Sequence, residues 1–460
     1  MKKIITSMIL SALVVLAGCG KDFLSSPDVQ KDPNRATQVS PDQLFNGIQV
    51  KAFFQQENNL SRITSLWVQH VSGTDRQAAS YAAYNITEST TSSEWSEFYI
   101  QGGLRDIRTL QAEAEAKGNR VYAGIAKFYE ALNIGTAASL WGDIPYSEAG
   151  AAVETPKLDP MQEVYNDLQT LLDEAIQDLQ SGERGSSLAN SPVNDVVYRA
   201  DPQKWIEACY SMKARLYMHW AEVDAGNYGR ARAAAVKGIS SWQNNFASVH
   251  RASLYEEFGW YNYFEQRDSY IRASRFMVDL LKSRNDPRLT VYYEPAASGE
   301  VIGSAVDERN VDASTLSVAI FLNPAHSFDI LSWEETQLIV AESAYQEGDE
   351  TAALAKLNET RRGVEQKWNL PVNSLGVASD LSGPALLDKI MEEKYIVMFL
   401  NIETFNDWKR TKRPVLVPYG GGDPETRIPH RLYYGEDERN SNPNIPPPAA
   451  QPIRNANDPF

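Results

Sequence analysis

Apolar residues recur at steps of three and four positions through much of the chain, which is the spacing of one face of an α-helix. Residues 160–182 show it most clearly: Asp159 and Pro160 fit a helix start, and Gly182 fits a helix stop. Residues 121–140 are apolar on more than one side, so we expect that helix to be buried between neighbours. The apolar positions of the first helix are Val164, Leu168, Leu171, Leu172, Ala175 and Leu179.

Two segments have the pattern of a helix-turn-helix repeat of the tetratricopeptide kind. The first has a helix at residues 204–223 and a turn at residues 226–228, and the second has a helix at residues 333–345 and a turn at residues 348–349. Because the turns are far apart, degenerate repeats with a long insertion fit better than a tandem array. Small or apolar residues that form the packing face of the second helix follow each turn, namely Ala231, Ala234 and Ala235, and then Ala352, Ala353 and Leu357.

The rest of the chain is less regular. Residues 240–330 are rich in aromatic residues, Gly and Pro, with short alternating apolar pieces such as residues 317–322, and the chain from Pro414 onward is rich in Pro, Gly and Asn. We expect extended loops there, packed onto the helices. The predicted fold is therefore mostly α: a tetratricopeptide-like helical repeat superhelix with a long irregular, loop-rich insertion and an extended C-terminal segment.

The N-terminus has the parts of an export signal. Lys2 and Lys3 precede an apolar stretch, residues 4–17, that is too short to span a bilayer comfortably. The stretch ends in LAGC, which resembles the bacterial lipoprotein cleavage box and implies a lipid on Cys19. An ordinary secretory peptide is the alternative. We predict a lipoprotein signal peptide at residues 1–18, a lipidated tether at residues 19–40 and an α-helical domain at residues 41–460, with membrane contact through the lipid anchor alone.

Composition narrows the function further. The chain has 60 acidic and 44 basic residues and a formal charge of -16, and such a field repels nucleic-acid phosphates. Cys209 has no disulfide partner once Cys19 carries lipid, so we expect it to be a core residue. The sequence has no HExxH, Walker, GxSxG or paired-cysteine zinc motif. We therefore expect no catalysis and no cofactor, with a structural calcium ion among the many carboxylates as the one alternative.

Several short strings can be read in order along the chain: LWGDIPY at residues 140–146, NDPRL at 285–289, EKYI at 393–396, FNDW at 405–408, RIP at 427–429 and NSNP at 440–443. Their order and spacing resemble the SusD/RagB family, and more closely its SusD-like branch. The resemblance implies an outer-membrane lipoprotein of the Bacteroidetes type that faces the cell surface, with four tetratricopeptide-like helix pairs. It also implies a TonB-dependent, SusC-like transporter as partner and a glycan or a peptide as ligand.

The same strings have a structural interpretation, which we favour over a ligand role. Trp141 would be buried where a helix ends, and Arg288 would pair with a carboxylate. The charged groups at residues 393–394 and 407–410 would form a packed, salt-bridged helix end.

Glycan sites combine flat aromatic rings with carboxylate, amide and guanidinium groups, because sugars present apolar C–H faces ringed by hydroxyl groups. Aromatic residues gather around a polar insertion at residues 72–93 and again at residues 258–264. Consecutive aromatics in the second segment point in different directions, so some must face water or a ligand. Burial in the core is the alternative, above all for Trp67 and Trp95. The candidate ligand-binding residues are Trp67, Gln69, Tyr81, Tyr84, Trp95, Trp260, Tyr261, Asn262 and Arg267.

These observations predict a cell-surface lipoprotein that captures a glycan, either an oligosaccharide or a polysaccharide, and delivers it uncut to the partner transporter. The same role for peptides, a surface glycan-degrading enzyme, and a repeat scaffold without a small ligand are the alternatives.

Overall fold

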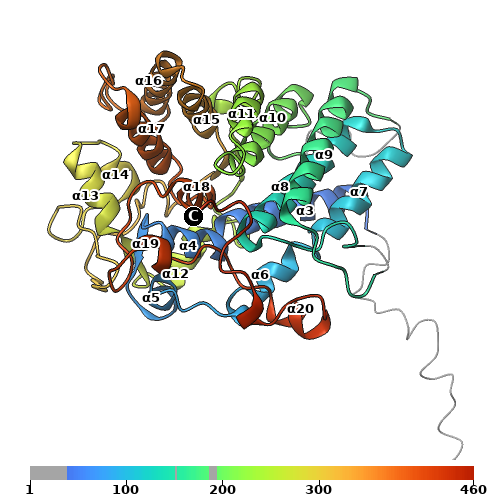
Figure 1. Ribbon diagram of the computed structural model, residues 1–460, viewed down its shortest axis with the longest axis horizontal. Helices are drawn as coiled ribbons and strands as arrows, with labels where there is room; N and C mark the ends of the chain where they lie inside the picture. The colour runs from blue at the N-terminus through green and yellow to red at the C-terminus, as the bar shows by residue number, and fades with distance from the viewer. Residues whose placement is uncertain (1–38, 151–152, 186–193) are drawn as a thin grey trace, which may run out of the picture.

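The computed structural model describes residues 39–150, 153–185 and 194–460. The predicted signal peptide (residues 1–18), Cys19 and the tether up to residue 38 lie outside the described residues and stay predictions. The first described helix, α3 (Pro41–Glu57), follows Ser40, whose hydroxyl accepts a hydrogen bond from the Gln43 backbone N–H at 3.3 Å. The described chain is mostly helical (Figure 1).

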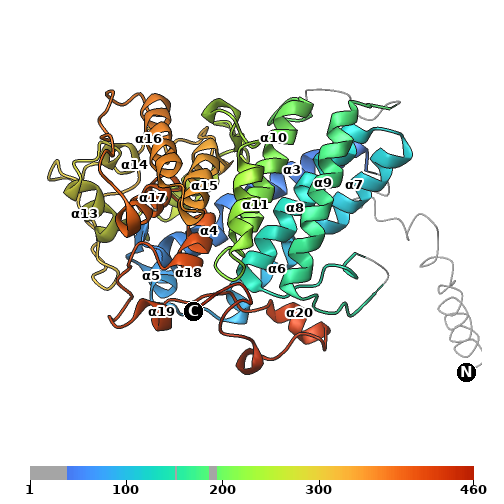
Figure 2. The ribbon, with the colours of Figure 1, turned by 45° about the horizontal axis from the view of Figure 1, so that its top comes forward.

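A row of packed helices forms the body of the molecule and consists of α7 (Leu104–Ala116), α8 (Arg120–Trp141), α9 (Met161–Ser181), α10 (Pro202–Met218), α11 (Gly226–Ala235), α15 (Trp333–Gln346), α16 (Glu350–Lys367) and α17 (Gly383–Val397). Each helix from α7 to α11 packs on the next, α11 packs on α15, and α15 packs on α16 and α17, so the row runs from right to left in Figure 2. The row continues directly from α11 to α15, although the insertion separates them in sequence. The mostly α, tetratricopeptide-like repeat fold is thus confirmed.

Two predicted helices are found almost unchanged. α9 begins one residue after Pro160 and ends where Gly182 turns into the left-handed region with a φ of +67°. α8 has buried residues on all of its sides from Val121 to Trp141, because α7 and α9 both cover it. Gly142 ends α8 at a φ of +84°, and a Cβ there would meet the Asn455 side-chain oxygen at 2.8 Å. The predicted burial of Trp141 is confirmed.

The sequence placed one turn wrongly. Residues 226–228, predicted as the turn of the first repeat, form the first turn of α11, and the helices of that pair are joined by residues 219–225. An Asx turn at Asp224 explains the difference, because its side chain accepts a hydrogen bond from the Gly226 backbone N–H at 3.0 Å and so turns the chain before residue 226. The alanines after the turn form a packing face as predicted, and they contact α15 as well as their paired helix α10; Ala231 is fully buried.

The insertion and the C-terminal segment contain only short elements. Strand β1 (Val71–Gly73) pairs antiparallel with β3 (Ile271–Ala273), with Ser72 opposite Arg272. Strand β2 (Phe246–Ala247) pairs antiparallel with β4 (Asp329–Leu331), with Phe246 opposite Leu331. Residues 318–322 form turns. The remaining elements are α4 (Asn59–Trp67), β1 (Val71–Gly73), α5 (Arg76–Ala82), η1 (Glu88–Thr90), α6 (Ser92–Glu97), η2 (Trp242–Asn244), β2 (Phe246–Ala247), α12 (Gly259–Gln266), β3 (Ile271–Ala273), α13 (Arg275–Ser283), α14 (Leu289–Tyr292), β4 (Asp329–Leu331), α18 (Glu403–Thr411), α19 (Pro424–Arg427), α20 (Glu436–Ser441) and η3 (Pro448–Ala450).

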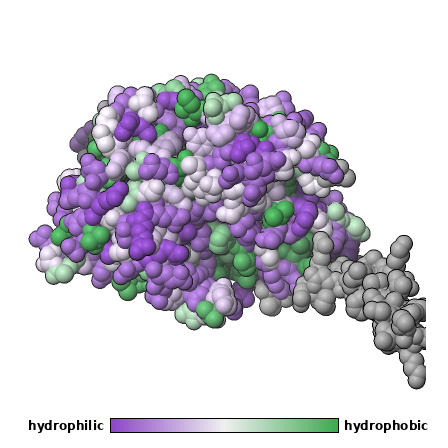
Figure 3. Space-filling view, turned by 90° about the horizontal axis from the view of Figure 1, so that it is seen from below, coloured by the Kyte–Doolittle hydropathy of each residue, from purple (hydrophilic) through white to green (hydrophobic). Residues whose placement is uncertain are grey.

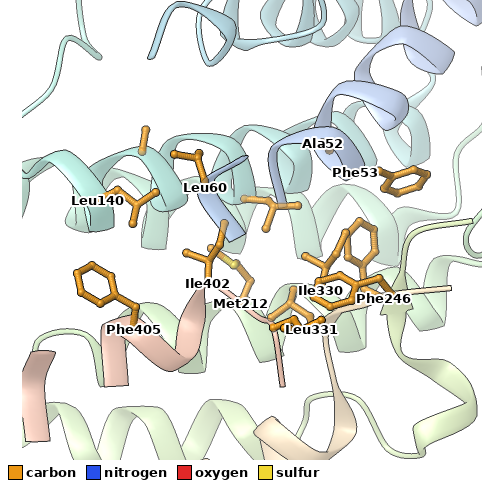
Figure 4. Close-up of a cluster of buried hydrophobic side chains, with 14 of the residues drawn as sticks. Ala52, Phe53, Leu60, Leu140, Met212, Phe246, Ile330, Leu331, Ile402 and Phe405 are labelled. Carbon is orange, nitrogen blue, oxygen red and sulfur yellow. The ribbon is translucent and has the colours of Figure 1, made fainter. Parts of the chain in front are cut away.

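One large hydrophobic core joins the row to the irregular parts. Figure 4 shows its middle, where α3, α4, α8, α10 and α18 meet β2 and β4. The side chains there come from both ends of the chain, as Phe53 and Phe405 illustrate. Two smaller clusters lie farther along the row, between α10, α11 and α15 and between α15, α16 and α17. Each is a contact between successive helices, as expected for a repeat protein.

Helix α18 is enclosed, and its charged side chains are paired inside the protein. Arg410 reaches Glu342 of α15 at 2.7 Å and Asp407 of its own helix at 2.6 Å. Nearby, Arg215 of α10 reaches Glu335 of α15 at 2.5 Å. All five side chains are at most 7% exposed. The predicted salt-bridged helix end is therefore confirmed.

A second buried ionic group lies at α17. Glu393 contacts Arg288 at 2.5 Å and Arg361 at 3.2 Å, and Arg288 also contacts Asp286 at 2.7 Å. Burial alone would raise the pKa of the Glu393 carboxyl, but Arg288 and Arg361 outweigh this effect and hold it at about 2. The ion pairs therefore contribute stability that is complete above the ordinary pKa of 4.5 and is lost as the pH falls toward 2.

We expect Glu393→Gln to lower the free energy of unfolding by about 3–5 kcal/mol, because Arg288 would stay buried beside a neutral amide. Thermal melts across the acid range should also show a smaller loss of stability between pH 4.5 and about 2 in the variant than in the wild type. Glu359→Gln is the control: this carboxylate of α16 is 47% exposed, and its loss should change stability by less than about 0.5 kcal/mol. Equal melting of wild type and Glu393→Gln would contradict the assignment.

Candidate functional site

Two of the predicted ligand residues instead join the helices on which the site is built. Trp67 of α4 and Trp260 of α12 are both fully buried. The Trp67 indole N–H donates to the backbone oxygen of Tyr81 at 3.1 Å, and the Trp260 indole N–H donates to the hydroxyl of Ser61 at 3.1 Å. These bonds tie α4 to α5 and to α12, which are grouped at the lower left of Figure 1. For both tryptophans the ligand role was wrong and the core alternative holds.

Around this frame lies a partly exposed group that we call the tyrosine–arginine cluster. Its centre is Tyr263 of α12, whose ring centroid lies 4.5 Å from the guanidinium carbon of Arg62 and 5.4 Å from that of Arg267. Tyr270 meets the Tyr263 ring edge to face at 6.3 Å. The members are Asn59, Arg62, Tyr81, Glu94, Tyr263, Arg267 and Tyr270.

The cluster presents several hydrogen-bonding groups. The Asn59 amide donates to Glu94 at 2.8 Å, and Asn59 also lies beside the Tyr81 hydroxyl. Arg62 makes one long hydrogen bond to Asn58, at 3.4 Å, and its Nε has no hydrogen-bond partner among the described residues. Amide, carboxylate, phenol and guanidinium groups are thus gathered beside two aromatic rings.

Burial sets the protonation of the two central groups. It lowers the pKa of Arg62 to about 10, although the neighbouring Tyr263 and Glu94 act in the opposite direction. It raises the pKa of Tyr263 to about 12, with Arg62 and Arg267 opposing it. At neutral pH the guanidinium is therefore charged and the phenol keeps its proton. The cluster can therefore donate hydrogen bonds from both groups.

Gln69 and Tyr84, two of the predicted ligand residues, each make a hydrogen bond to the C-terminal segment. The Gln69 amide donates to the backbone oxygen of Val417 at 2.5 Å, and the Tyr84 hydroxyl accepts from the Tyr419 backbone N–H at 3.0 Å. Gln69 follows the end of α4 and Tyr84 follows the end of α5, so both side chains hold the C-terminal segment close to the ends of these two helices. One polar atom of each side chain bonds to backbone, and both residues lie outside the tyrosine–arginine cluster.

Trp95 lies in the core, although the adjacent Glu94 belongs to the cluster. It is 1% exposed, and its ring meets Trp141 at 5.4 Å and Tyr434 at 5.3 Å, both edge to face. The ligand role was wrong for Trp95 as well.

Tyr261 and Asn262 do lie on α12 with Tyr263, and Asn262 is exposed, but neighbouring positions on a helix point in different directions. Of the nine candidates, the structure brings Tyr81 and Arg267 into the cluster.

Five members of the cluster were not predicted as ligand residues, namely Asn59, Arg62, Glu94, Tyr263 and Tyr270. A signal for Tyr263 was present: it lies three residues after Trp260 and four before Arg267, so on a helix it shares an edge with both. Arg62 had no such signal, because its contact with α12 depends on the hydrogen bond between Ser61 and Trp260 across 199 residues.

Comparison with known proteins identifies the family. Residues 33–435 match the family model SusD-like_2, described as "Starch-binding associating with outer membrane". The chain belongs to this SusD-like family. No protein with a curated function matches the sequence.

Solved structures share the SusD-like fold at low sequence identity. A protein described as chitin-binding is 22% identical, with a TM-score of 0.76 over 88% of this chain and 95% of its own. A SusD/RagB family protein from Bacteroides thetaiotaomicron is 20% identical, with a TM-score of 0.72 over 92% and 97%. A chitin-binding SusD homolog from Flavobacterium johnsoniae is 17% identical, with a TM-score of 0.73 over 90% and 97%.

The described ranges also bear on membrane crossing and metal binding. No described helix has the length and apolar character needed to cross a bilayer. Nor do three or more His, Cys, Asp or Glu side chains gather there in a way that could hold a metal ion, so no residues can be assigned to the calcium site considered from the sequence.

We expect Trp260→Ala to lower the free energy of unfolding by about 3–5 kcal/mol, because it empties a fully buried site and removes the hydrogen bond to Ser61. Asn262→Ala, an exposed position on the same helix, is the control and should change stability by less than about 0.5 kcal/mol. Thermal or urea unfolding measures both. Wild-type stability of Trp260→Ala would return Trp260 to the list of ligand candidates.

Proposed function

We propose that this protein binds a neutral glycan at the tyrosine–arginine cluster and does not cut it. The observation that carries the proposal is the position of Tyr263, a partly exposed ring held beside two guanidinium groups, an amide and a carboxylate. Sugar rings need this combination, because their C–H faces pack on aromatic rings while their hydroxyls exchange hydrogen bonds with the surrounding groups.

The flexibility of the cluster also suits a ligand. Arg267 has only a 3.3 Å hydrogen bond to the adjacent Gln266 amide, so its guanidinium can move off the Tyr263 ring when a sugar arrives. Arg62 is fixed more firmly, because its guanidinium lies 4.5 Å from the Tyr263 ring centroid and also donates to the Asn58 side chain. One guanidinium can therefore position the ring while the other adapts to the ligand.

The surroundings and the relatives support a saccharide. Hydrophilic residues cover most of the face shown in Figure 3, and hydrophobic residues form small separate patches there. The family is described as starch-binding, and two of the structurally similar proteins are described as chitin-binding. A peptide ligand remains an outcome that the binding experiment below can reveal.

We further propose that the protein is anchored by lipid on Cys19 at the outer surface of the outer membrane, where it delivers the glycan to a TonB-dependent, SusC-like transporter. The sequence LAGC before and at Cys19 supports the anchor, and the family description supports the outer membrane. Delivery needs only that the ligand is held reversibly. A partly open cluster of aromatic and polar groups suits moderate affinity, because it buries limited area.

Tyr263→Ala should weaken glycan binding about tenfold, since the ring and its contacts contribute about 1–1.5 kcal/mol to a stacked sugar. Calorimetric titration with neutral oligosaccharides of glucose, N-acetylglucosamine, xylose and mannose, and with a peptide library, measures the effect. Tyr345→Ala, a partly buried tyrosine on α15, is the matched control and should bind as the wild type does. The sugars should be recovered at their original length. Binding of peptides alone, or steady release of shorter sugars, would overturn the proposal.

Replacement of the proposed lipid site gives a separate test. Cys19→Ala should abolish incorporation of labelled palmitate and move the protein out of the membrane fraction. Cys209→Ala should leave both unchanged, because the Cys209 thiol is fully buried in α10. If Cys19→Ala still incorporated palmitate and sedimented with membranes, the anchor assignment would be wrong, whereas the glycan proposal would stand.

A further inference from the structure

A groove of about 490 Å³ lies apart from the tyrosine–arginine cluster. Its walls come from η2, from residues 321–332, from the C-terminal end of α16 and from residues 397–401. None of these segments contributes to the cluster. The size is sufficient for a few sugar rings, since ligand sites of about 300–1,000 Å³ hold small organic molecules.

The tryptophans of the chain are distributed in an uneven way. All ten lie in the described ranges, and eight of them are at most 8% exposed. The two that are more exposed, Trp242 and Trp368, both line this groove. Large indole rings are normally buried, so two partly open rings in one groove indicate a surface that is covered by something else when the protein works.

The polar lining selects among possible ligands. Among the described lining residues, Lys367 alone has a lysine or arginine side chain. Its ammonium donates to Asp329 at 2.5 Å and to Glu334 at 2.6 Å. Two carboxylates thus face one ammonium, and the local charge is negative. Burial, with a smaller effect of Lys367, lowers the pKa of His326 to about 3, so this imidazole is neutral in the groove. Phosphate, sulfate and uronate groups would find no unpaired positive charge there.

The contacts of Trp368 show how a ring would be held. The Lys367 ammonium lies 5.4 Å from the Trp368 ring centroid and so fixes the indole at the end of α16. Across the lining, Phe328 is stacked on Phe258 at 5.8 Å, and His326 meets Phe258 at 5.0 Å and Phe321 at 5.0 Å. The groove therefore has a rigid aromatic wall with a carboxylate, a neutral imidazole and amides at its edge.

We infer that this groove is a second saccharide site, in which Trp242 and Trp368 pack against the C–H faces of a neutral oligosaccharide and Asp329 accepts hydrogen bonds from its hydroxyls. The inference rests on the proposed function, because it takes the ligand to be a glycan. It adds a separate place of contact on other elements of the fold. A long glycan held at two places dissociates more slowly than one held at a single place.

Fluorescence of the whole chain in detergent tests the inference directly. Because eight indoles are buried, quenching by acrylamide reports mainly on Trp242 and Trp368. The probes are hexasaccharides of glucose, N-acetylglucosamine, xylose and mannose. We expect one of them to protect the exposed indoles, and we expect the protection to persist in the Tyr263→Ala protein, whose cluster is impaired.

Variants of the groove complete the test. Trp368→Ala should raise the Kd of the protected event about tenfold, which corresponds to about 1.4 kcal/mol, and Trp368→Phe should raise it less because a flat ring remains. Titration of Trp242→Ala should also show a raised Kd for the protected event. Melting temperatures identify any variant that is unfolded, and Trp368→Phe then carries the comparison.

The outcomes separate the two proposals. If a sugar binds and Tyr263→Ala abolishes binding while the indoles stay unprotected, the second site is wrong and the proposed function stands. If the indoles are protected but Tyr263→Ala has no effect, the second site stands and the site proposed at the cluster is wrong. If no sugar in the panel binds any form of the protein, both are overturned.

Discussion

Helix α18 places charged side chains where water is excluded, and the elements packed around it must supply the opposite charges. Glu342 and Glu335 come from α15, Lys394 from α17 and Arg215 from α10. A buried charge without its partner costs several kcal/mol, whereas a complete set of pairs roughly balances desolvation. The ion pairs therefore add little net stability but strongly disfavour any other arrangement of these four helices. They specify how the last repeat helices close around the C-terminal part of the chain.

The same region fixes the frame of the candidate site. Leu400, just before α18, donates its backbone N–H to Nδ1 of His70 at 3.0 Å, and the other ring nitrogen lies 3.0 Å from the Tyr395 backbone oxygen. Burial lowers the pKa of His70 to about 3, so the ring is neutral and one nitrogen can accept while the other donates. The Ser61 hydroxyl donates to the Leu400 backbone oxygen at 2.6 Å and accepts from Trp260. The segment just before α18 thus holds α4 directly and α12 through Ser61.

The sequence predicted those parts whose cause is local. The apolar spacing of α9, its proline start and its glycine stop belong to one short segment, so the helix could be placed within about one residue. The burial of Trp260 is caused by Ser61, 199 residues away, and by the Leu400 oxygen that Ser61 also contacts. Nothing near position 260 carries that information. An aromatic-rich segment therefore indicated the right neighbourhood for the cluster but not which ring would be exposed.

The division between repeat and irregular segments explains where ligand surfaces can form. A helix such as α8 contacts neighbours on nearly all sides, so almost any change in its side chains disturbs packing. Tyr263 and Trp242 lie instead on a short helix and a single 3₁₀ turn inside the insertion, and Trp368 lies just past the end of α16. Side chains at these positions pack against fewer neighbours than those of α8. They can therefore be replaced by other side chains while the ion pairs of α18 stay intact. A fold of this kind can change its ligand without changing its assembly.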